Sequence, residues 1–305
     1  MKVIVVIVTY NPLQWIKKCL DSLVFSSIPV DILIIDNNST DGFQEILKSN
    51  YSNVQLVQNV NNLGFGAANN IGIKKAYDTN ADFVFLLNQD AWVQTDTIEK
   101  LISAQQKEPE FGIVSPMHLN GKGDQLDYNF SNYIIPFQCK GLYSDIYLNK
   151  VKESIYKVNF VNAAGWLLSR KCIEIVGGFS PSFFHYSEDD NYIDRVHFHQ
   201  LKVGVLGTAM LYHDREERSS NVYFEDSILL YKRRIVLKAS NPFLEFSFQT
   251  EIKKRYRYAL KAMFSFRFKL FLKIISQIKL INTLDKKSIL SRRNESKTAK
   301  LAFLN

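Results

Sequence analysis

Short runs of apolar residues alternate along the chain with segments in which apolar residues recur every three or four positions. A short run rich in β-branched residues is typical of a buried strand, and the wider spacing is typical of a helix with one buried face. Strands are expected at Lys2–Val8, Asp31–Asp36, Val54–Val57, Phe83–Leu87, Gly112–Ser115, Lys157–Arg170 and Val203–Tyr212. Helices are expected from Pro12 to Val24 and at Phe43–Lys48, Ala67–Tyr77, Asp96–Lys107 and Glu188–Gln200. These repeated units predict an α/β protein with a mostly parallel central sheet and helices on both faces.

Between His118 and Lys157 the periodicity fades, and Tyr, Asn and Gly accumulate. Stretches without a hydrophobic period that are rich in polar residues and glycine are typical of loops. We therefore expect an insertion or a mobile loop in this part of the chain.

The composition is that of a globular protein. The 305 residues are 46% hydrophobic and 22% charged, which disfavours the disordered and collagen-like classes. The apolar run Val3–Val8 is too short to span a membrane and lacks the cleavage site of a secretory signal. Cys19, Cys139 and Cys172 are widely spaced and odd in number, so they predict neither a disulfide framework nor a metal knuckle. A reducing cytosol is the expected compartment.

The net charge of +8 is unevenly distributed. Residues 231–305 hold 19 Lys and Arg against 4 acids, whereas residues 1–230 hold 19 Lys and Arg against 26 acids. A mildly acidic body therefore precedes a strongly basic tail, and such a tail typically meets an anionic surface. We expect an α/β domain, which would bind the ligand and carry the catalytic residues, over residues 1–230, and a basic, aromatic-rich helical tail over 231–305.

Within the tail, apolar and aromatic residues from Leu260 to Ile278 keep steps of three and four, with Lys and Arg between them. This pattern predicts a basic amphipathic helix that lies in the interface of an anionic membrane. The alternative is a helical subdomain that packs its aromatic face on the body. Nucleic acid is not expected as a partner, because nothing upstream resembles a nucleic-acid-binding fold.

Two nucleotide-binding motifs are absent. The first strand is followed by Thr9-Tyr10-Asn11-Pro12, which has none of the glycines of the dinucleotide fingerprint G-x-G-x-x-G. The nearest match begins at Gly64, after the third strand, and ends in Asn69. The phosphate-binding pattern G-x-x-x-x-G-K-[ST] does not occur either. The sequence therefore disfavours a hydride-transfer enzyme with a dinucleotide cofactor and a P-loop phosphoryl-transfer enzyme.

Unusual polar residues follow the predicted strands, at Thr9–Asn11, Asp36–Asn38, Asn88–Asp90 and His213. In open parallel sheets, ligands bind beyond the carboxyl ends of the strands. The Asp36 carboxylate could accept the imide N–H of a pyrimidine base, or it could cap the turn that follows. The Asp90 carboxylate could hold Mg²⁺ or Mn²⁺ against a diphosphate, or it could form a turn.

Three acids, Glu188, Asp189 and Asp190, begin the last predicted helix. Clustered carboxylates repel one another, so at least one can titrate upward and serve as a general base. The alternative is that they complement the dipole at the start of the helix. His213 could be a second metal or phosphate ligand, or a structural histidine.

Five motifs occur in order along residues 1–220. They are Val8-Thr9-Tyr10-Asn11, the segment from Ile34 to Gly42, the segment from Asn61 to Gly72, the segment from Leu86 to Ala91, and Gly177-Gly178-Phe179 with Ser187-Glu188-Asp189-Asp190. In combination they resemble family 2 glycosyltransferases of the GT-A fold, particularly the rhamnosyltransferase-like bacterial branch. The resemblance implies a Rossmann-like sheet for the body, and it leaves the basic tail outside.

The resemblance implies an inverting glycosyltransferase. It would move rhamnose or another hexose from a UDP- or dTDP-linked donor to a hydroxyl of a lipid-linked glycan, in cell-surface polysaccharide or O-antigen synthesis. A divalent cation, Mg²⁺ or Mn²⁺, is the expected cofactor. The tail would hold the enzyme as a peripheral protein at the cytoplasmic face of the cell membrane.

The resemblance also implies roles for individual residues. Asp189 is expected to be the catalytic base. Glu188 is expected to contact the acceptor or donor sugar, and so is Trp166, in the motif Asn162-Ala163-Ala164-Gly165-Trp166. Asp90 and His213 are expected to hold the metal. The nucleotide-sugar donor is expected to contact Thr9, Tyr10, Asn11, Asp36, Asn38, Gly64, Asn69, Asn70, Asn88 and Asp90. Asn88 stands where the family has the first Asp of a D-x-D motif, so it can contact ribose but contributes no charge.

Other functions fit parts of the sequence. A non-catalytic nucleotide-sugar or glycan-binding module would share the fold, although the retained acids and His213 disfavour it. Nucleotidyl transfer would favour a Lys- and Arg-rich loop after the first strand, and there is none. A membrane adaptor would use the tail and keep the body as a scaffold.

Overall fold

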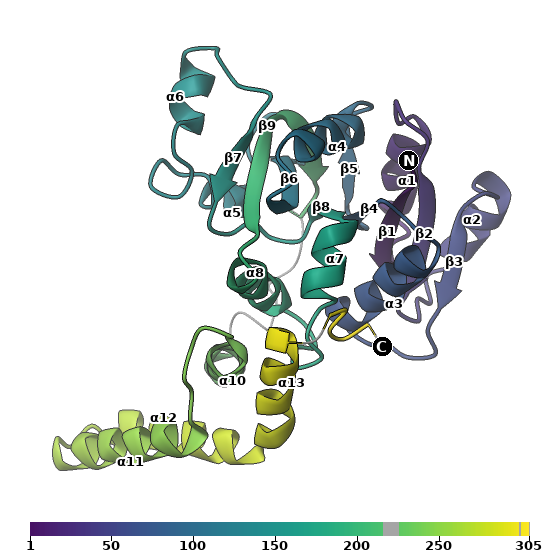
Figure 1. Ribbon diagram of the computed structural model, residues 1–305. Helices are drawn as coiled ribbons and strands as arrows, with labels where there is room; N and C mark the ends of the chain where they lie inside the picture. Colours follow the sequence, from purple (N-terminus) through teal and green to yellow (C-terminus); the bar gives the residue numbers. More distant parts are fainter. Residues whose placement is uncertain (216–225, 299, 305) are drawn as a thin grey trace.

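The computed structural model describes residues 1–215, 226–298 and 300–304, and within these ranges nine strands form one sheet (Figure 1). The strands are β1 (Val3–Thr9), β2 (Asp31–Asp36), β3 (Gln55–Gln58), β4 (Phe83–Asn88), β5 (Ala91–Val93), β6 (Phe111–Asn120), β7 (Ile155–Val158), β8 (Gly165–Ser169) and β9 (Lys202–His213). Their order across the sheet is β3-β2-β1-β4-β8-β6-β9-β5, and β7 also pairs with β9.

Strands β1 to β4 form the parallel part of the sheet. Helices cover both faces of β1, β2 and β4, so nearly all of their residues are buried, which explains their continuous apolar runs. The register places Thr9 beside Asp36 and Val8 beside Asn88. The carboxyl ends of β1, β2 and β4 therefore meet at one edge of the sheet, as the strand pattern predicts.

The rest of the sheet is mixed, with β6 parallel to β9, and the predicted fold class is confirmed. β8 lies antiparallel to β4 and β6, and β5 and β7 lie antiparallel to β9. The single strand expected at Lys157–Arg170 is in fact two, β7 and β8, which pair with different partners. β5 has three residues, too few to show a period in the sequence.

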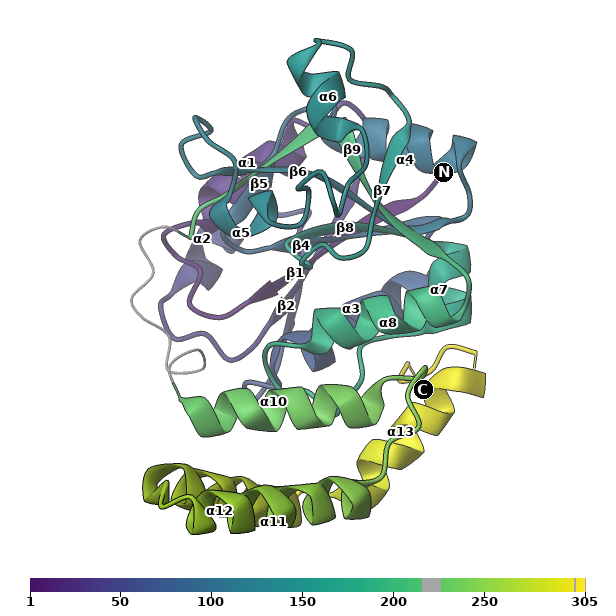
Figure 2. The same ribbon diagram turned by 90° about the vertical axis from the view of Figure 1, so that its left-hand side faces the viewer.

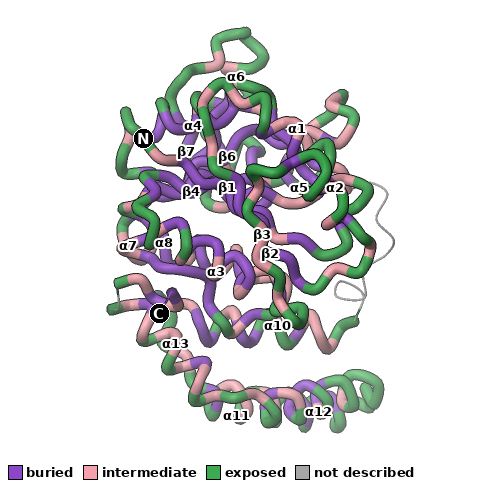
Figure 3. Tube along the Cα trace, turned by 90° about the vertical axis from the view of Figure 1, so that its right-hand side faces the viewer, coloured by how far each residue is buried: buried purple, intermediate pink, exposed green. Residues whose placement is uncertain are grey.

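Two layers of helices cover the sheet. One face packs against α1 (Ile16–Val24), α2 (Phe43–Asn50) and α4 (Thr97–Lys107), and the other against α3 (Phe65–Asp78), α7 (Arg170–Val176) and α8 (Glu188–Phe198). In Figure 3 the strands and the helix faces that meet them are mostly buried, and the C-terminal helices have buried positions of their own. The helix expected from Pro12 begins at Ile16, because the Pro12 carbonyl first accepts the Trp15 and Ile16 N–H groups in a turn.

Residues 118–157 are built into the core, contrary to the expectation of a mobile loop. β6 continues to Asn120, and the short helices α5 (Tyr128–Ser131) and α6 (Leu142–Tyr147) follow before β7. The buried side chains of this segment include Phe130, Ile134, Cys139 and Leu142, in the same core as α3, α7 and α8. Helices this short repeat their pattern at most once, so the sequence carries little periodic signal for them.

The C-terminal region is helical, as predicted, and its described residues form α10 (Ser227–Ser240), α11 (Phe248–Phe264), α12 (Phe268–Thr283) and α13 (Lys286–Thr298). The amphipathic pattern expected to form one helix is broken where Phe266 has a φ of 54°, and α11 and α12 form an antiparallel hairpin (Figure 2). α10 lies between the body and this hairpin, and after α13 the chain returns to the core through Leu304. None of the helices in the described ranges combines the length and the apolar character needed to cross a membrane.

Candidate active site

Two cavities adjoin at the edge where β1, β2 and β4 end. The strand-end cavity, of about 560 Å³, is lined by Val8, Thr9, Tyr10, Asn11, Trp15, Asn37, Asn62, Gly64, Phe65, Asn88, Gln89, Asp90, Phe184 and His185. The acid cavity, of about 570 Å³, is lined by Phe65, Asn88, Asn129, Tyr133, Phe160, Asn162–Ala164, His185–Asp190, His213, Arg215, Leu230, Arg233 and Arg234. Both have the size of small-molecule sites, and they share Phe65, Asn88 and His185.

Asp36 is fully buried and does not line either cavity. Its carboxylate accepts hydrogen bonds from the Thr9 hydroxyl at 2.9 Å, from the Ser39 N–H at 3.1 Å and from the Ser39 hydroxyl. These bonds fasten the end of β1 to the turn that follows β2. Thr9 lines the strand-end cavity, and so does Asn37, the residue after Asp36. Asp36 therefore lies behind the wall of the cavity and supports it.

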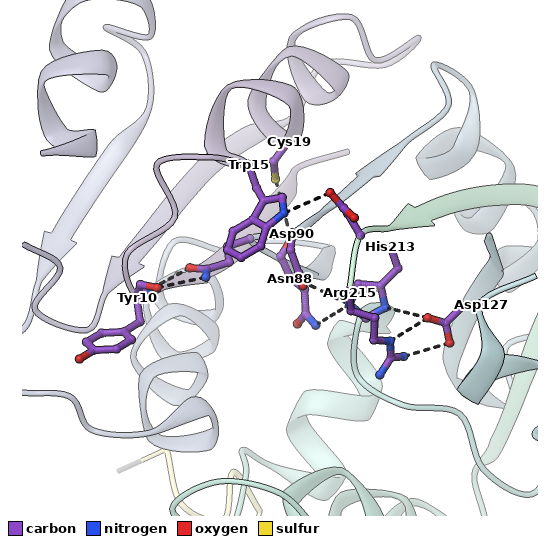
Figure 4. A network of polar contacts seen from close by, with 10 residues as sticks. Tyr10, Trp15, Cys19, Asn88, Asp90, Asp127, His213 and Arg215 are labelled. Atoms are coloured by element: carbon purple, nitrogen blue, oxygen red, sulfur yellow. Dashed lines mark hydrogen bonds and ion pairs between the residues drawn. The ribbon is translucent and has the colours of Figure 1, made fainter. Parts of the chain in front are cut away.

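The turn after β1 presents Tyr10 and Asn11 to the strand-end cavity. The Gln89 side chain accepts from the Tyr10 N–H at 2.7 Å and donates to the Tyr10 carbonyl at 3.1 Å (Figure 4). Asn11 has a φ of 49°, and its side-chain oxygen accepts from the Thr40 N–H at 2.9 Å. The side chains of Asn11 and Gln89, together with the Asp36 carboxylate, thus hold the turns after β1, β2 and β4 in one arrangement.

Gly64 lines the strand-end cavity at the start of α3. Its φ is 83°, and a Cβ at this position would lie 2.0 Å from the Phe184 carbonyl oxygen. Only glycine fits such a backbone conformation and such a close approach. The contact brings the segment before α8 against α3, where Phe184 and His185 complete the wall of the cavity.

Besides Asp36, three more residues expected at the donor, Asn38, Asn69 and Asn70, lie outside the lining of both cavities. Asn69 is buried and donates to the Phe65 carbonyl at 3.0 Å. The Asn70 amide donates to the Phe179 carbonyl at 2.8 Å and accepts from the Phe179 N–H at 2.6 Å, which joins α3 to the segment after α7. Asn38 is exposed and has a φ of 66°.

Asn88, Asp90 and His213 meet at the border between the cavities (Figure 4). His213 Nε2 lies 3.5 Å from Asp90 Oδ1 and 3.5 Å from the Asn88 side-chain nitrogen. Burial, followed by the Arg215 charge, lowers the pKa of His213 to about 3. The imidazole is therefore neutral at neutral pH, which is the form that binds a metal.

Asp90 and His213 fit a divalent cation as part of its ligand set. Adjacent ligands of an octahedral ion at 2.0–2.1 Å are about 3 Å apart, close to the observed separation. The described residues contain no group of three or more His, Cys, Asp or Glu side chains that could hold a metal by themselves. Mg²⁺ sites commonly use one or two protein ligands and complete the shell with phosphate oxygens and water.

Arg215 adds a cation beside this border, and it is held by Asp127. Its Nε and one terminal nitrogen lie 2.7 and 3.1 Å from the Asp127 carboxylate, which also accepts from the Phe130 N–H at 2.8 Å (Figure 4). Neither Arg215 nor Asp127 was expected at the site. Asp127 lies in the segment where the hydrophobic periodicity fades. The only sequence signal for Arg215 is its position two residues after His213.

Glu188, Asp189 and Asp190 form the first turn of α8 and line the acid cavity. Burial raises the pKa of Glu188 and of Asp189 above the usual range of carboxyl groups. The charge of the neighbouring carboxylate raises each pKa further, Asp189 acting on Glu188 and Asp190 acting on Asp189. A carboxyl group whose pKa moves toward neutrality is suited to general-base catalysis.

The approach to these acids is strained. Tyr186 and Ser187, directly before α8, have φ values of 67° and 72°, in the left-handed region that such residues rarely adopt. Strain of this kind persists where the surrounding structure imposes it, and it concentrates at functional sites. Here it turns the first residues of α8 into the acid cavity.

Trp166 lies in the core and lines neither cavity. It is fully buried, and its ring stacks on Phe179 with 6.1 Å between the ring centres. The preceding residues, Asn162–Ala164, do line the acid cavity. The motif around Trp166 therefore reaches the site through its backbone and small residues, while the tryptophan packs between the sheet and α8.

α10 completes the acid cavity with Leu230, Arg233 and Arg234. The Arg233 guanidinium lies over the Tyr186 ring, 5.2 Å from its centre. These arginines were not expected at the site, because they belong to a tail whose overall charge suggested a membrane surface. No local motif distinguishes them from the other basic residues of that tail.

Comparisons with known proteins agree on one family. The family model described as glycosyl transferase family 2 matches residues 4–173, more than half of the chain. The N-acetylglucosaminyl-diphospho-decaprenol L-rhamnosyltransferase of Mycobacterium tuberculosis is 27% identical over 230 residues, which cover 68% of this chain and 75% of that protein. The dTDP-rhamnosyl transferase RfbF of Shigella flexneri is 23% identical over 220 residues, covering 71% and 70%.

Solved structures share the fold. S. aureus TarS in complex with UDP-GlcNAc aligns with a TM-score of 0.58 and 15% identity, over 98% of this chain and 84% of that chain. The mannosyltransferase PcManGT of Pyrobaculum calidifontis, in complex with GDP-Man and Mn²⁺, aligns with a TM-score of 0.56 and 15% identity, over 97% and 73%. The GT-A fold and the enzyme class predicted from the motifs are confirmed, and the chain belongs to glycosyl transferase family 2.

Proposed function

We propose that the protein transfers rhamnose or another hexose, with inversion, from a UDP- or dTDP-linked donor to a hydroxyl of a lipid-linked glycan in cell-surface polysaccharide synthesis. The observation that carries the proposal is a cluster of three acids, Glu188 buried and Asp189 and Asp190 partly buried, in a cavity that adjoins the strand-end cavity. The names of the Mycobacterium and Shigella relatives support rhamnose and a diphospho-linked acceptor. O-antigen synthesis is one process in which such a glycan would be extended.

The donor fits the strand-end cavity. Its nucleoside would lie against the neutral turns around Tyr10 and Asn37, and its diphosphate would reach Asn88 and Asp90 at the border. Asp90 and His213 would hold a divalent cation there, Mg²⁺ or Mn²⁺, which supplies a Lewis acid for the charge on the departing diphosphate. Arg215, oriented by Asp127, is placed to share that charge.

The acceptor fits the acid cavity. The ionised Asp189 carboxylate removes the proton of the acceptor hydroxyl as the hydroxyl oxygen attacks the anomeric carbon from the face opposite the diphosphate. The new glycosidic bond forms as the bond from the anomeric carbon to the diphosphate oxygen breaks. The electron pair of that bond leaves with the nucleoside diphosphate, and the anomeric configuration is inverted. General-base assistance of this kind contributes about 10²–10⁴-fold in rate.

A donor screen followed by product analysis tests the proposal. Thermal shifts are measured with UDP-, dTDP- and GDP-sugars, with and without Mn²⁺, and the selected donor is incubated with an alkyl-diphosphate-linked sugar. We expect stabilisation by a UDP- or dTDP-sugar, because a ligand that binds only the folded state raises its stability. The product should have an inverted anomeric linkage. A GDP-sugar as the sole ligand, or a retained configuration, contradicts the proposal.

The tail supports a peripheral location at an anionic membrane. α10 and α13 pack on the body, whereas the tip of the α11–α12 hairpin exposes Phe264, Phe266 and Phe268, whose exposed fractions are 76%, 81% and 59%. Lys261, Arg267, Lys269 and Lys273 lie among them. Aromatic residues interleaved with basic residues bind the headgroup region of anionic bilayers.

Sedimentation with vesicles tests this location. The triple variant Phe264→Ser, Phe266→Ser and Phe268→Ser should move from the pellet to the supernatant with vesicles that contain phosphatidylglycerol. Phe137→Ser, which removes a 90% exposed aromatic residue from the body, is the matched control and should sediment like the wild type. Equal sedimentation of the triple variant and the control contradicts the membrane role of the tip.

A further inference from the structure

The acid cavity holds two sets of opposite charges on two neighbouring helices. The carboxylates of Glu188, Asp189 and Asp190 come from the first turn of α8, and Arg233 and Arg234 come from α10. We propose that Arg233 and Arg234 bind the diphosphate group of the acceptor while Asp189 acts on its hydroxyl. This inference rests on the proposed function, and it assigns the substrate anion to residues outside the segment that the family model matches.

Arg233 lies within electrostatic reach of the acids. Its guanidinium is stacked over the Tyr186 ring, and its positive charge opposes the rise in the pKa of Glu188 and of Asp190. A guanidinium stacked on an aromatic face presents its N–H groups along the edge, in the fork that matches phosphate oxygens. Burial and the Arg233 charge also lower the pKa of His185, which favours its neutral form. The positive charge on this wall of the acid cavity therefore belongs to Arg233 and not to His185.

Arg234 extends this wall toward solvent. It is exposed and lines the same cavity as the acids. Within the described residues it forms no ion pair, unlike Arg215, which Asp127 engages through two nitrogens. An arginine held beside a cavity without a carboxylate partner is suited to an anionic ligand, since charge-assisted bonds to phosphate are stronger than neutral ones.

The position of the pair favours the acceptor over the donor. Neither Arg233 nor Arg234 lines the strand-end cavity, whose border with the acid cavity already contains Asp90 and His213. A donor diphosphate would end at that border. The α10 arginines lie on a different wall, which only a second anion in the acid cavity would use.

The fold gives a lipid-linked anion a route to this wall. α10 packs on α12 and α13 and lies between the body and the basic α11–α12 hairpin (Figure 2). An acceptor whose lipid stays in a membrane beside the hairpin would pass α10 before its sugar reaches α8. A molecule with a phosphate-linked sugar carries an anion and a nucleophilic hydroxyl together, which matches a cavity with arginines on one helix and carboxylates on the next.

A binding measurement that needs no catalysis tests the inference. Decyl diphosphate is titrated against the protein in the presence of saturating UDP or dTDP, whichever the donor screen selects, so that the donor site is filled. We expect Arg234→Gln and Arg233→Gln each to weaken decyl diphosphate binding roughly tenfold or more, the range for loss of a hydrogen bond to a charged group. The affinity for the nucleoside diphosphate itself should not change.

Lys238→Gln is the matched control, because Lys238 is an exposed cation on α10 that lines neither cavity. It should bind decyl diphosphate like the wild type, and decyl maltoside, which has the same chain without charge, should not distinguish the variants. Unchanged decyl diphosphate binding in Arg234→Gln overturns the inference. A loss of nucleoside diphosphate affinity instead would assign the arginines to the donor and overturn it as well.

A kinetic arm separates this inference from the proposed function. With a diphosphate-linked acceptor, Arg234→Gln should raise the acceptor KM by a larger factor than the donor KM. Equal increases in KM for the diphosphate-linked acceptor and for an alkyl glycoside of the same sugar would contradict phosphate recognition. Binding of decyl diphosphate that depends on Arg234, in a protein that transfers no sugar, would refute the proposed function and leave the anion site intact.

Discussion

The two cavities adjoin, yet they are built in opposite ways. The strand-end cavity is lined mainly by turns that follow β1, β2 and β4, and its polar residues are mostly amides and hydroxyls. The acid cavity gathers residues from seven parts of the chain, around positions 65, 88, 130, 162, 188, 214 and 233. Its described lining holds three carboxylates and three arginines. One cavity is made by local chain geometry, and the other by tertiary packing.

The two cavities also differ in their polar groups, which are mostly neutral in the strand-end cavity, whereas the acid cavity holds charged side chains of both signs. In the strand-end cavity, neutral side chains make their hydrogen bonds within the protein: Gln89 donates to the Tyr10 backbone carbonyl, and Asn59 donates to the Asn37 side chain at 3.0 Å. In the acid cavity, burial raises the pKa of neighbouring carboxyls, so their ionised forms destabilise the fold. Proteins retain such destabilising groups where function requires them. We therefore expect changes to the carboxylates of the acid cavity to affect the rate of transfer, and changes in the strand-end cavity to affect donor affinity.

The largest expected effect is on catalysis. Asp189→Asn should lower the rate of sugar transfer by about 10²–10⁴-fold, because the amide cannot accept the hydroxyl proton. In free energy of activation this is about 3–5 kcal/mol. Steady-state assays with saturating donor measure it, and thermal shifts with the nucleotide-sugar measure donor affinity, which should stay close to that of the wild type.

The stability of Asp189→Asn shows whether any loss of activity comes from unfolding. A carboxyl whose folded-state pKa is raised favours the fold at low pH, and this contribution is lost as the pH rises through the folded-state pKa. Asp189→Asn should therefore be at least as stable as the wild type at pH 8, where the native carboxyl is more ionised. Turnover near the wild-type level would remove Asp189 from the mechanism, and lost donor affinity would erase the contrast between the cavities.

The next effect concerns the border between the cavities. Asp90→Ala should weaken the Mn²⁺-dependent part of donor binding by about 10- to 100-fold, since even the loss of a residue that only hydrogen-bonds to a metal ligand has an effect of this size. Thermal shifts with the selected donor, with and without Mn²⁺, give the measurement. Asp96→Ala removes a surface carboxylate paired with Lys100 and is the matched control. A donor shift that responds equally to Mn²⁺ in both variants would show that Asp90 holds no metal.

The sequence predicts the strand-end cavity far better than the acid cavity. Apolar runs locate β1, β2 and β4, and in a parallel sheet the residues after them must meet, so Thr9, Asn88 and Asp90 could be brought together without coordinates. What the sequence could not supply is the direction of a side chain. Asp36 points to Thr9 and Ser39 instead of the cavity, because two hydroxyls and an N–H satisfy its carboxylate there.

The acid cavity depends on contacts that no local pattern records. Asp127 lies in a segment whose short elements have no clear period, and Arg233 lies in a helix that resembles the rest of the basic tail. Trp166 shows the converse error: its motif does mark the site, but the ring packs on Phe179 and the neighbouring backbone lines the cavity. Packing between distant segments decided each of these positions.

A smaller effect is expected at Gly64, which contacts the segment Phe184–His185 in the wall that the two cavities share. Gly64→Ala should lower the free energy of unfolding by about 1–3 kcal/mol, because φ is 83° and the new Cβ would meet the Phe184 carbonyl oxygen. Since Phe184 and His185 would have to move, donor and decyl diphosphate affinities should fall together. Gly42→Ala is the control: its φ is 82° but nothing lies within 4 Å of the new Cβ, so stability alone should change. Loss of only one of the two affinities in Gly64→Ala would contradict a shared wall.

The smallest expected effect is a shift in pH dependence. Asp189 acts in its ionised form, so kcat/KM should fall as the pH drops through its pKa, which burial raises first and the Asp190 charge second. Asp190→Asn removes the second cause and leaves the first, so the acid limb should move to lower pH by about one unit. Glu188, Tyr133 and Arg233 line the same cavity and remain in place. Asp194→Asn, one turn along α8 and bonded to Asn241, is the control and should leave the limb unmoved. If Asp190→Asn instead abolishes transfer at every pH, Asp190 is the base, and the acid cavity is arranged around a different carboxylate.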